Sequence, residues 1–311
     1  MQHEPDLGAA SHSPARTLRD LYHASRMVRD RRQHVRHVFG RFLEAATGRG
    51  LTITLRVPSD LRESPFVAPV LREREDRLRL RLRSSAAHLY TDVNVLRQVC
   101  DDYFRIPACV PRPGELVIDA GANVGCYTLV AALLEPTARL HAFEPLSSAY
   151  ASLATNCRIN ALTGRVVANR AALGSETAEL ELRRTGEGGQ GTLARDLVID
   201  GDYWSEMTPV VPLDRYVADA GLRTPDIIKL DVEGYEVELA TGAVNTLRNV
   251  RLLIAEWHSP ERLQELMRAT GDAGLELVSS CSDDRDEPIG IAYFDRPAAG
   301  ESQSRVGCPM R

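Results

Sequence analysis

The segment Val117-Ile-Asp-Ala-Gly-Ala-Asn-Val-Gly125 constrains the fold more than any other part of the sequence. A short apolar strand ends at Asp119, and Gly121 and Gly125 then bracket a tight turn that opens a helix. Glycine lets a ligand lie against the main chain, and the start of a helix offers unpaired N–H groups. The turn is G-x-x-x-G and lacks the central glycine of the dinucleotide-binding G-x-G-x-x-G. Asp119 at the strand tip favours a cationic group, such as the amino group of a methionyl moiety, over a pyrophosphate.

Strand and helix patterns alternate along the chain after Pro113. Apolar runs predict strands at 116–120, 139–143, 165–168, 226–231, 250–255, 275–279 and 289–294. Helices are predicted between them at 125–134, 147–160, 236–247 and 260–269, and a hairpin through 179–183. Such alternation predicts an α/β, Rossmann-like doubly wound sheet of about seven strands with helices on both faces. Ligands of such sheets bind beyond the carboxyl ends of the strands.

The segments around this sheet are predicted from composition and periodicity. Residues 1–50 are expected to form a basic helical extension with a mobile start, and 51–112 two lead-in strands and a helix from Asp92 to Phe104. The sheet domain is predicted over 113–296, followed by a disordered tail at 297–311. The net charge of -5 argues against nucleic acid as a partner. A packing role, or a homo-oligomer formed through the N-terminal helices, is expected of the basic extension instead.

Hydropathy and cysteine usage indicate where the protein works. No apolar run approaches the roughly 18 residues needed to span a bilayer, and no signal peptide is recognisable. Six cysteines are scattered without paired C-x-x-C spacing, which predicts reduced thiols in a cytoplasmic protein. Only one of the 38 basic residues is a lysine, Lys229.

A second acidic position follows Asp119 by roughly 25 residues, at the strand-end spacing of nucleotide-binding sheets. The strand at 139–143 ends in Glu144-Pro145. A carboxylate at the tip of the second strand is placed to bind both hydroxyls of a ribose. The alternative is that Glu144 caps the helix that begins at Ser147.

Together with three further segments, these two motifs resemble the FkbM-type methyltransferases. The further segments are Val211-Pro-Leu-Asp-Arg-Tyr216, Asp226-Ile-Ile-Lys-Leu-Asp-Val-Glu-Gly-Tyr-Glu236 and Leu253-Ile-Ala-Glu-Trp-His258. The resemblance covers residues 90–296 and implies a class I fold that uses S-adenosylmethionine. It implies that the first segment holds the methionine part of the cofactor and that the Glu-Pro carboxylate holds the ribose. The cofactor-binding residues expected on this basis are Asp119, Gly121, Asn123, Gly125 and Glu144.

Candidate catalytic residues follow the next two strands. Lys229, Asp231 and Glu233 point the same way at a period of two, and Glu256 and His258 share a face of the following strand. A carboxylate or a histidine with a pKa near neutrality is expected to act as general base for an acceptor hydroxyl. The alternatives are that Asp231 binds the cofactor, that Glu233 caps a helix and that Lys229 only neutralises the carboxylates. The acidic cluster could also hold magnesium, although no spacing requires it.

The sequence therefore predicts a methyltransferase that uses S-adenosylmethionine to methylate a hydroxyl group. The resemblance points to a small-molecule or carbohydrate acceptor: a sugar, a polysaccharide precursor or a secondary metabolite. Tyr103, Tyr203 and Trp204 are candidates for an aromatic lid over it. Two alternatives stay open, an NAD-dependent oxidoreductase on a Rossmann-like fold and a non-catalytic, cofactor-binding scaffold.

Overall fold

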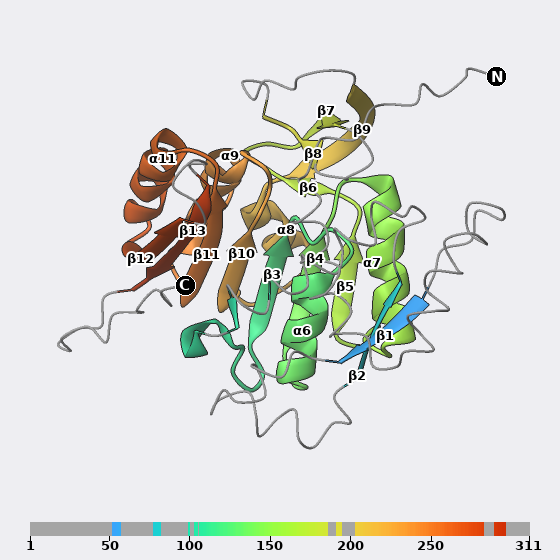
Figure 1. The fold of residues 1–311 in the computed structure, drawn as a ribbon. Helices are drawn as coiled ribbons and strands as arrows, with labels where there is room; N and C mark the ends of the chain where they lie inside the picture. The colour runs from blue at the N-terminus through green and yellow to red at the C-terminus, as the bar shows by residue number, and fades with distance from the viewer. Residues whose placement is uncertain are drawn as a thin grey trace, which may run out of the picture.

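The computed structural model describes residues 52–56, 77–81, 106–185, 191–194, 203–282 and 289–296, together with Val99, Tyr103 and Phe104. The predicted N-terminal extension and C-terminal tail lie outside these residues, as does most of the helix expected before Phe104. Figure 1 shows a central sheet flanked by helices, with a smaller sheet at one end of it.

The central sheet has seven strands in the order β12-β13-β11-β10-β3-β4-β5. Five of them are parallel, and β13 runs antiparallel to both of its neighbours. The order reverses between β3 and β10, and such a switch point is where open α/β sheets bind ligands. This confirms the predicted doubly wound sheet. Its strands are β3 (Leu116–Ala120), β4 (Arg139–Phe143), β5 (Val166–Asn169), β10 (Ile227–Leu230), β11 (Leu252–Trp257), β12 (Glu276–Ser282) and β13 (Gly290–Asp295).

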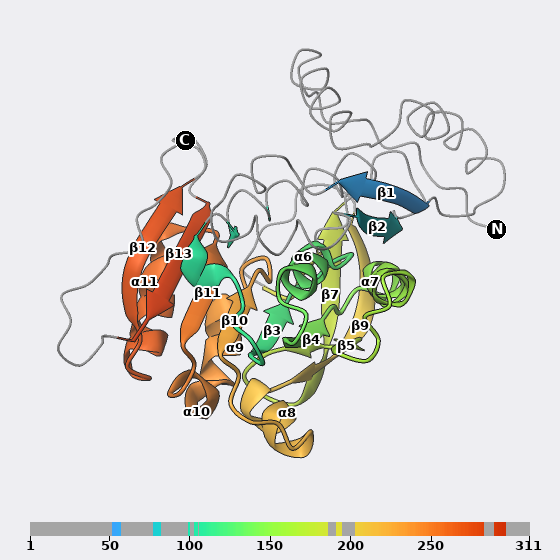
Figure 2. The ribbon, with the colours of Figure 1, turned by 90° about the horizontal axis from the view of Figure 1, so that it is seen from below.

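Helices cover both faces of this sheet, and its strands are apolar on both sides for that reason. In β10, Ile227 packs into one core with α6 and α7, whereas Ile228 packs into the other with the helices of the opposite face. Figure 2 shows α6 and α7 above the sheet and α8 and α10 below it. The helices are α6 (Cys126–Leu134), α7 (Ser147–Ile159), α8 (Leu213–Asp219), α9 (Glu236–Thr241), α10 (Val244–Leu247) and α11 (Pro260–Gly271).

A four-stranded sheet in the order β6-β9-β7-β8 lies beyond the carboxyl ends of β3 and β4 (Figure 1). Its strands are β6 (Ala172–Leu173), β7 (Ala178–Thr185), β8 (Gly191–Thr192) and β9 (Tyr203–Val211). The sequence predicted only a hairpin at 179–183 here. Glu206 of β9 fixes this sheet to the first residue of α7, because its carboxylate accepts from the backbone N–H and the hydroxyl of Ser147 at 2.5 and 2.7 Å.

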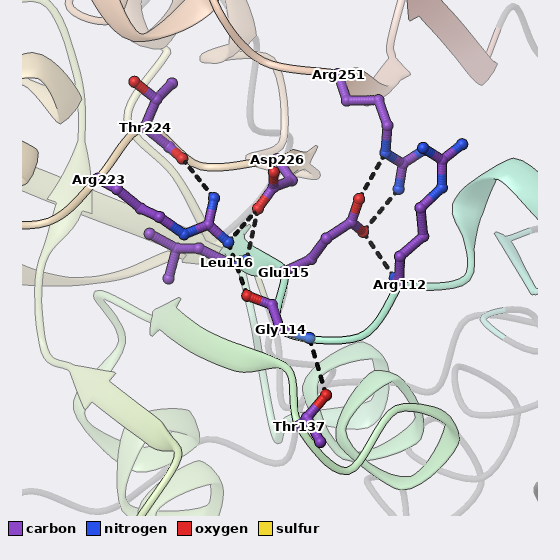
Figure 3. A network of polar contacts seen from close by, with 9 residues as sticks. All are labelled: Arg112, Gly114, Glu115, Leu116, Thr137, Arg223, Thr224, Asp226 and Arg251. Atoms are coloured by element: carbon purple, nitrogen blue, oxygen red, sulfur yellow. Dashed lines mark hydrogen bonds and ion pairs between the residues drawn. The ribbon is translucent and has the colours of Figure 1, made fainter.

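A network of charges links the amino ends of three central strands (Figure 3). Both oxygens of Glu115 accept from the guanidinium of Arg251 at 2.8 Å. Asp226 Oδ2 accepts from the backbone N–H of Leu116 at 2.7 Å and lies 2.6 Å from Arg223 Nη2. Since these residues flank β3, β10 and β11, the network fixes the alignment of the three strands at the edge opposite the predicted site.

Two further strands pair antiparallel, β1 (Thr52–Arg56) with β2 (Arg77–Arg81), as the alternating sequence there predicted. The helix predicted over 236–247 is instead split at Gly242. A side chain at Gly242 would lie 1.9 Å from the carbonyl oxygen of Gly174, so the chain presses closely on its neighbour there. Asp214 accepts from the backbone N–H groups of Asn245 and Thr246 and so caps the second helix, α10.

Two predictions about individual residues were wrong. Tyr103 is 4% exposed and packs edge-on against Tyr127 in the core, so it cannot form part of a lid. Cys281 is disulfide-bonded rather than reduced, while Cys109, Cys126 and Cys157 are free, buried thiols. No helix among the residues described here has the length and apolar character needed to cross a bilayer.

Candidate active site

The turn after β3 brings its backbone close to the loop after β10. Gly121 has a φ of 74°, and a Cβ atom there would lie 1.7 Å from the carbonyl oxygen of Asp231, so only glycine fits. Gly125 has a φ of 95°, and Asn123 is also left-handed, with a φ of 51°. Within the described part of the chain, Asn123 Oδ1 is a buried acceptor without a hydrogen-bond donor. The unpaired acceptor of Asn123 fits the polar end of a small ligand.

Glu144 follows β4 directly and lies against this turn. Its Oε2 accepts from the backbone N–H of Asn123 at 2.7 Å, and its Oε1 from that of Leu146 at 2.8 Å. Glu144 therefore also contacts the N-cap residue of α7, while Glu206 accepts from the first residue of that helix. Glu144 thus joins the turn after β3 to the start of α7 through its two carboxylate oxygens.

Lys229 occupies the centre of the site and is 2% exposed. Its Nζ lies 3.3 Å from Asp119 Oδ1 and 3.1 Å from Asp231 Oδ2, and it donates to the carbonyl oxygen of Gly121 at 3.0 Å. Burial lowers the pKa of Lys229, but the attraction of Asp231 and Asp119 outweighs it, and the pKa lies above its ordinary value. Lys229 is therefore a fixed cation shared by β3 and β10.

Asp119 is fully buried beneath the turn. Besides Lys229, it meets the hydroxyl of Thr128 on α6, which donates to Oδ2 at 2.5 Å. The structure thus places Asp119 among protein partners, from which it supports the backbone of the turn.

Two carboxyl groups, those of Asp231 and Glu256, interact at the ends of β10 and β11. Burial raises the pKa of Asp231, but attraction by Lys229 and a hydrogen bond from Glu256 bring it below its ordinary value. Burial and the neighbouring charge of Asp231 raise the pKa of Glu256 well above its ordinary value. The proton of the pair is therefore held more tightly by Glu256 than by Asp231.

Glu233 lies in a sharp turn between β10 and α9. It has a φ of 53° and is followed by Gly234 at 90°. Glu236, the first residue of α9, accepts from the backbone N–H of Gly234 at 3.0 Å and so closes this turn. Burial raises the pKa of Glu233, while a hydrogen bond with His258 lowers it, and the net shift is upward. With 23% of its side chain exposed, Glu233 is the more accessible of the two carboxylates that contact His258.

His258 follows β11 and lies between those two carboxylates. Nε2 is 3.2 Å from Glu233 Oε2, and Nδ1 is 3.3 Å from Glu236 Oε1. Burial lowers the pKa of His258, but these two contacts outweigh it and raise the pKa to about 11. The predicted pKa near neutrality was therefore wrong, because Glu236 adds a second negative charge. His258 is an imidazolium at physiological pH and holds no free lone pair to accept a proton.

The structure thus gathers the candidate residues into two connected groups at the carboxyl edge of the sheet. The cofactor candidates surround the turn after β3, and the catalytic candidates lie one and two strands away. Sequence reasoning missed Glu236, although its spacing of three residues from Glu233 was visible. It also missed Thr192, because more than 40 positions separate Thr192 from Glu236 in the sequence. Within the described ranges, no group of three or more His, Cys, Asp and Glu side chains is arranged to hold a metal ion.

Comparison with known proteins gives the family. The FkbM methyltransferase domain matches residues 119–274, just over half of the chain. The 31-O-demethyl-FK506 methyltransferase FkbM of Streptomyces tacrolimicus is 27% identical in an alignment of 197 residues that covers 54% of this chain and 75% of that enzyme. The hexuronic acid methyltransferase AglP of Haloferax volcanii is 25% identical over 182 residues, 58% of this chain and 72% of that enzyme.

Among solved structures, a methyltransferase FkbM from Methylobacillus flagellatus is 16% identical with a TM-score of 0.45, over 76% of this chain and 60% of that one. The sequence match decides the class of enzyme, in favour of methyl transfer and against an NAD-dependent oxidoreductase. The chain belongs to the FkbM methyltransferase family and is an S-adenosylmethionine-dependent methyltransferase.

Proposed function

We propose that this enzyme methylates a hydroxyl oxygen of a carbohydrate or secondary-metabolite acceptor, with Glu233 as general base. The observation that carries this proposal is Glu233 itself, a partly exposed carboxylate with a raised pKa at the carboxyl edge of the sheet. A raised pKa brings a carboxylate closer to the operating pH, where a general base works best. The names of the two relatives support an oxygen-rich acceptor, since one specifies a 31-O position and the other hexuronic acid.

The residues of the turn after β3 suit the proposed cofactor. Glu144 would accept from the ribose hydroxyls, and the Gly121 and Asn123 backbone would lie against the methionine part. Asp119 and Lys229 would act beneath them, as supports for the turn. When bound, S-adenosylmethionine supplies a methyl group on a positively charged sulfur and departs as S-adenosylhomocysteine.

Glu233 would take the proton of the acceptor hydroxyl as the new carbon–oxygen bond forms and the carbon–sulfur bond breaks. His258 cannot share this role while it is protonated, but its hydrogen bond to Glu233 favours the ionised form of that carboxylate. Asp231 forms an ion pair with Lys229, and we assign it to the support of the cofactor turn. Holding the acceptor in line with the methyl group would supply much of the remaining acceleration.

The test measures methyl transfer by mass spectrometry to a hexuronic acid glycoside, a macrolide with a free hydroxyl, and an amine analogue of each. We expect product from a hydroxyl acceptor and none from the amines. Glu233→Gln should lower kcat about 10²–10⁴-fold with cofactor affinity kept. Glu261→Gln, an exposed carboxylate in the first turn of α11, is the matched control. Methylation of the amines alone would refute the proposed acceptor class, and wild-type turnover by Glu233→Gln would refute the base. Cofactor binding without methyl transfer would favour the scaffold alternative.

A further inference from the structure

The small sheet touches the acidic cluster through one buried hydroxyl. Thr192 of β8 is 4% exposed, and its Oγ1 donates to the carbonyl oxygen of Glu233 at 2.6 Å. The same oxygen accepts from the backbone N–H of Ala194 at 2.9 Å. The hydroxyl is thus oriented, because it donates its proton to Glu233 and accepts a hydrogen bond from Ala194.

The residue that receives this hydrogen bond has an unfavourable backbone conformation. A glutamate at a φ of 53° lies in the left-handed region, which costs free energy that glycine would not lose. Such a conformation persists only where the surroundings determine it. Glu236 holds one side of the turn, because its carboxylate accepts from the backbone N–H of Gly234, the residue after Glu233. Thr192 holds it from the other side of the same peptide bond, through the carbonyl group of Glu233.

The β8 segment is itself anchored. Arg183 of β7 donates to the carbonyl oxygen of Ala194 at 2.5 Å, two residues after Thr192. Glu206 of β9 fixes the same sheet to Ser147, close to the ribose candidate Glu144. A displacement of the small sheet would therefore be transmitted to both halves of the site.

We propose that Thr192 is a positioning residue that holds Glu233 in the strained conformation from which its carboxylate works. The proposal rests on the function proposed above. Thr192 contacts neither reacting group and acts only through the peptide group of Glu233. The small sheet is then part of the catalytic machinery, and not only a wall beside it.

The experiment compares Thr192→Val, which keeps the shape and removes the hydroxyl, with Thr192→Ser, which keeps the hydroxyl. We expect Thr192→Val to lower kcat about 10–100-fold, because small displacements of a catalytic group have effects of this size. Thr192→Ser should stay within about threefold of the wild type, since the hydrogen bond survives. Calorimetry should give an unchanged Kd for S-adenosylmethionine in both. If Thr192→Val does not fold, Thr192→Ala against Thr192→Ser provides the same comparison.

A double-mutant cycle with Glu233→Gln separates positioning from general destabilisation. If Thr192 acts through the base, Thr192→Val should cause no further loss in the Glu233→Gln background. An equal loss in both backgrounds, wild-type turnover by Thr192→Val, or a Thr192→Ser variant as slow as Thr192→Val would each overturn the proposal. The Glu233→Gln variant alone tests the base, so failure of the proposed function is visible separately.

Discussion

The ammonium of Lys229 on β10 donates to the carbonyl oxygen of Gly121 at 3.0 Å, so a side chain of one strand holds the turn that follows its neighbour. The same ammonium lies 3.3 Å from the buried carboxylate of Asp119 on β3 and 3.1 Å from the carboxylate of Asp231, just after β10. Three acceptors around one compact charge suit lysine better than the planar fork of arginine. In a chain whose other 37 basic residues are arginines, this requirement explains why the lysine stands here.

Lys229→Met should therefore unfold at a lower denaturant concentration and bind S-adenosylmethionine more weakly. Removing one partner of a buried charge cluster costs about 3–5 kcal/mol, because the remaining charges stay buried. Lys229→Arg should not restore binding. Urea unfolding and calorimetry give the two quantities. The control is Arg215→Met, which removes an exposed ion pair with Asp219 and should change stability little. Wild-type stability of Lys229→Met would contradict the role of Lys229 as the cation that supports this turn.

Glu144→Ala should weaken the binding of S-adenosylmethionine by about 1–3 kcal/mol, the effect of leaving hydroxyl partners unmet. Glu144→Gln should fall between the alanine variant and the wild type, because an amide still offers one acceptor oxygen. Titration calorimetry on folded variants measures this, with the exposed Glu179→Ala as control. Unchanged affinity in folded Glu144→Ala would remove the ribose assignment.

The pH dependence of turnover should follow Glu233 and not His258. Activity requires the ionised carboxylate, so kcat/KM should fall as pH drops through the raised pKa of Glu233. His258→Gln removes the hydrogen bond that lowers this pKa and should move the fall to higher pH. Rate profiles over roughly pH 5 to 9 cover the range in which such a base titrates. A profile that His258→Gln leaves in place would show that the pair is not coupled.

The stability conferred by His258 should decline in alkaline solution. Its pKa rises from 6.5 in the unfolded chain to about 11 in the folded protein, so the contribution is complete below pH 6.5. It is lost as pH rises through that interval to about 11. The difference in free energy of unfolding between wild type and His258→Gln should accordingly be larger at pH 6 than at pH 9, as the linkage of proton binding to folding requires. Urea titrations at both values test it, and an equal difference would argue against a charged histidine.

The sequence was sufficient to predict the parts of the fold that local pattern determines. The apolar runs gave the seven strands of the central sheet, and the glycines at 121 and 125 gave the turn between β3 and α6. Strand β9 was missed because it pairs with β7, from which residues 186–202 separate it along the chain. Pairing of this kind depends on contacts that no local window contains.

For the site, types of residue were predictable but their charge states were not. The period of two placed Lys229 and Asp231 together correctly. The pKa of His258 depends on Glu236, which reaches it from a helix after a left-handed turn, and spacing alone does not show that approach. The contact between Thr192 and Glu233 could not be predicted from spacing either, because it joins two different sheets.

The charge network at the amino ends of β3, β10 and β11 has a consequence at the far edge of the sheet. In β10, Lys229 alternates with Ile228 and Leu230, which pack into the apolar core of the opposite face. A slip of β10 by one residue would exchange these faces, leaving the ammonium among hydrocarbon and two aspartates uncompensated. Leu116 donates to Asp226 in the native register, so the network favours that register over the slipped one. Replacing Asp226 should therefore weaken the preference of β10 for its native alignment.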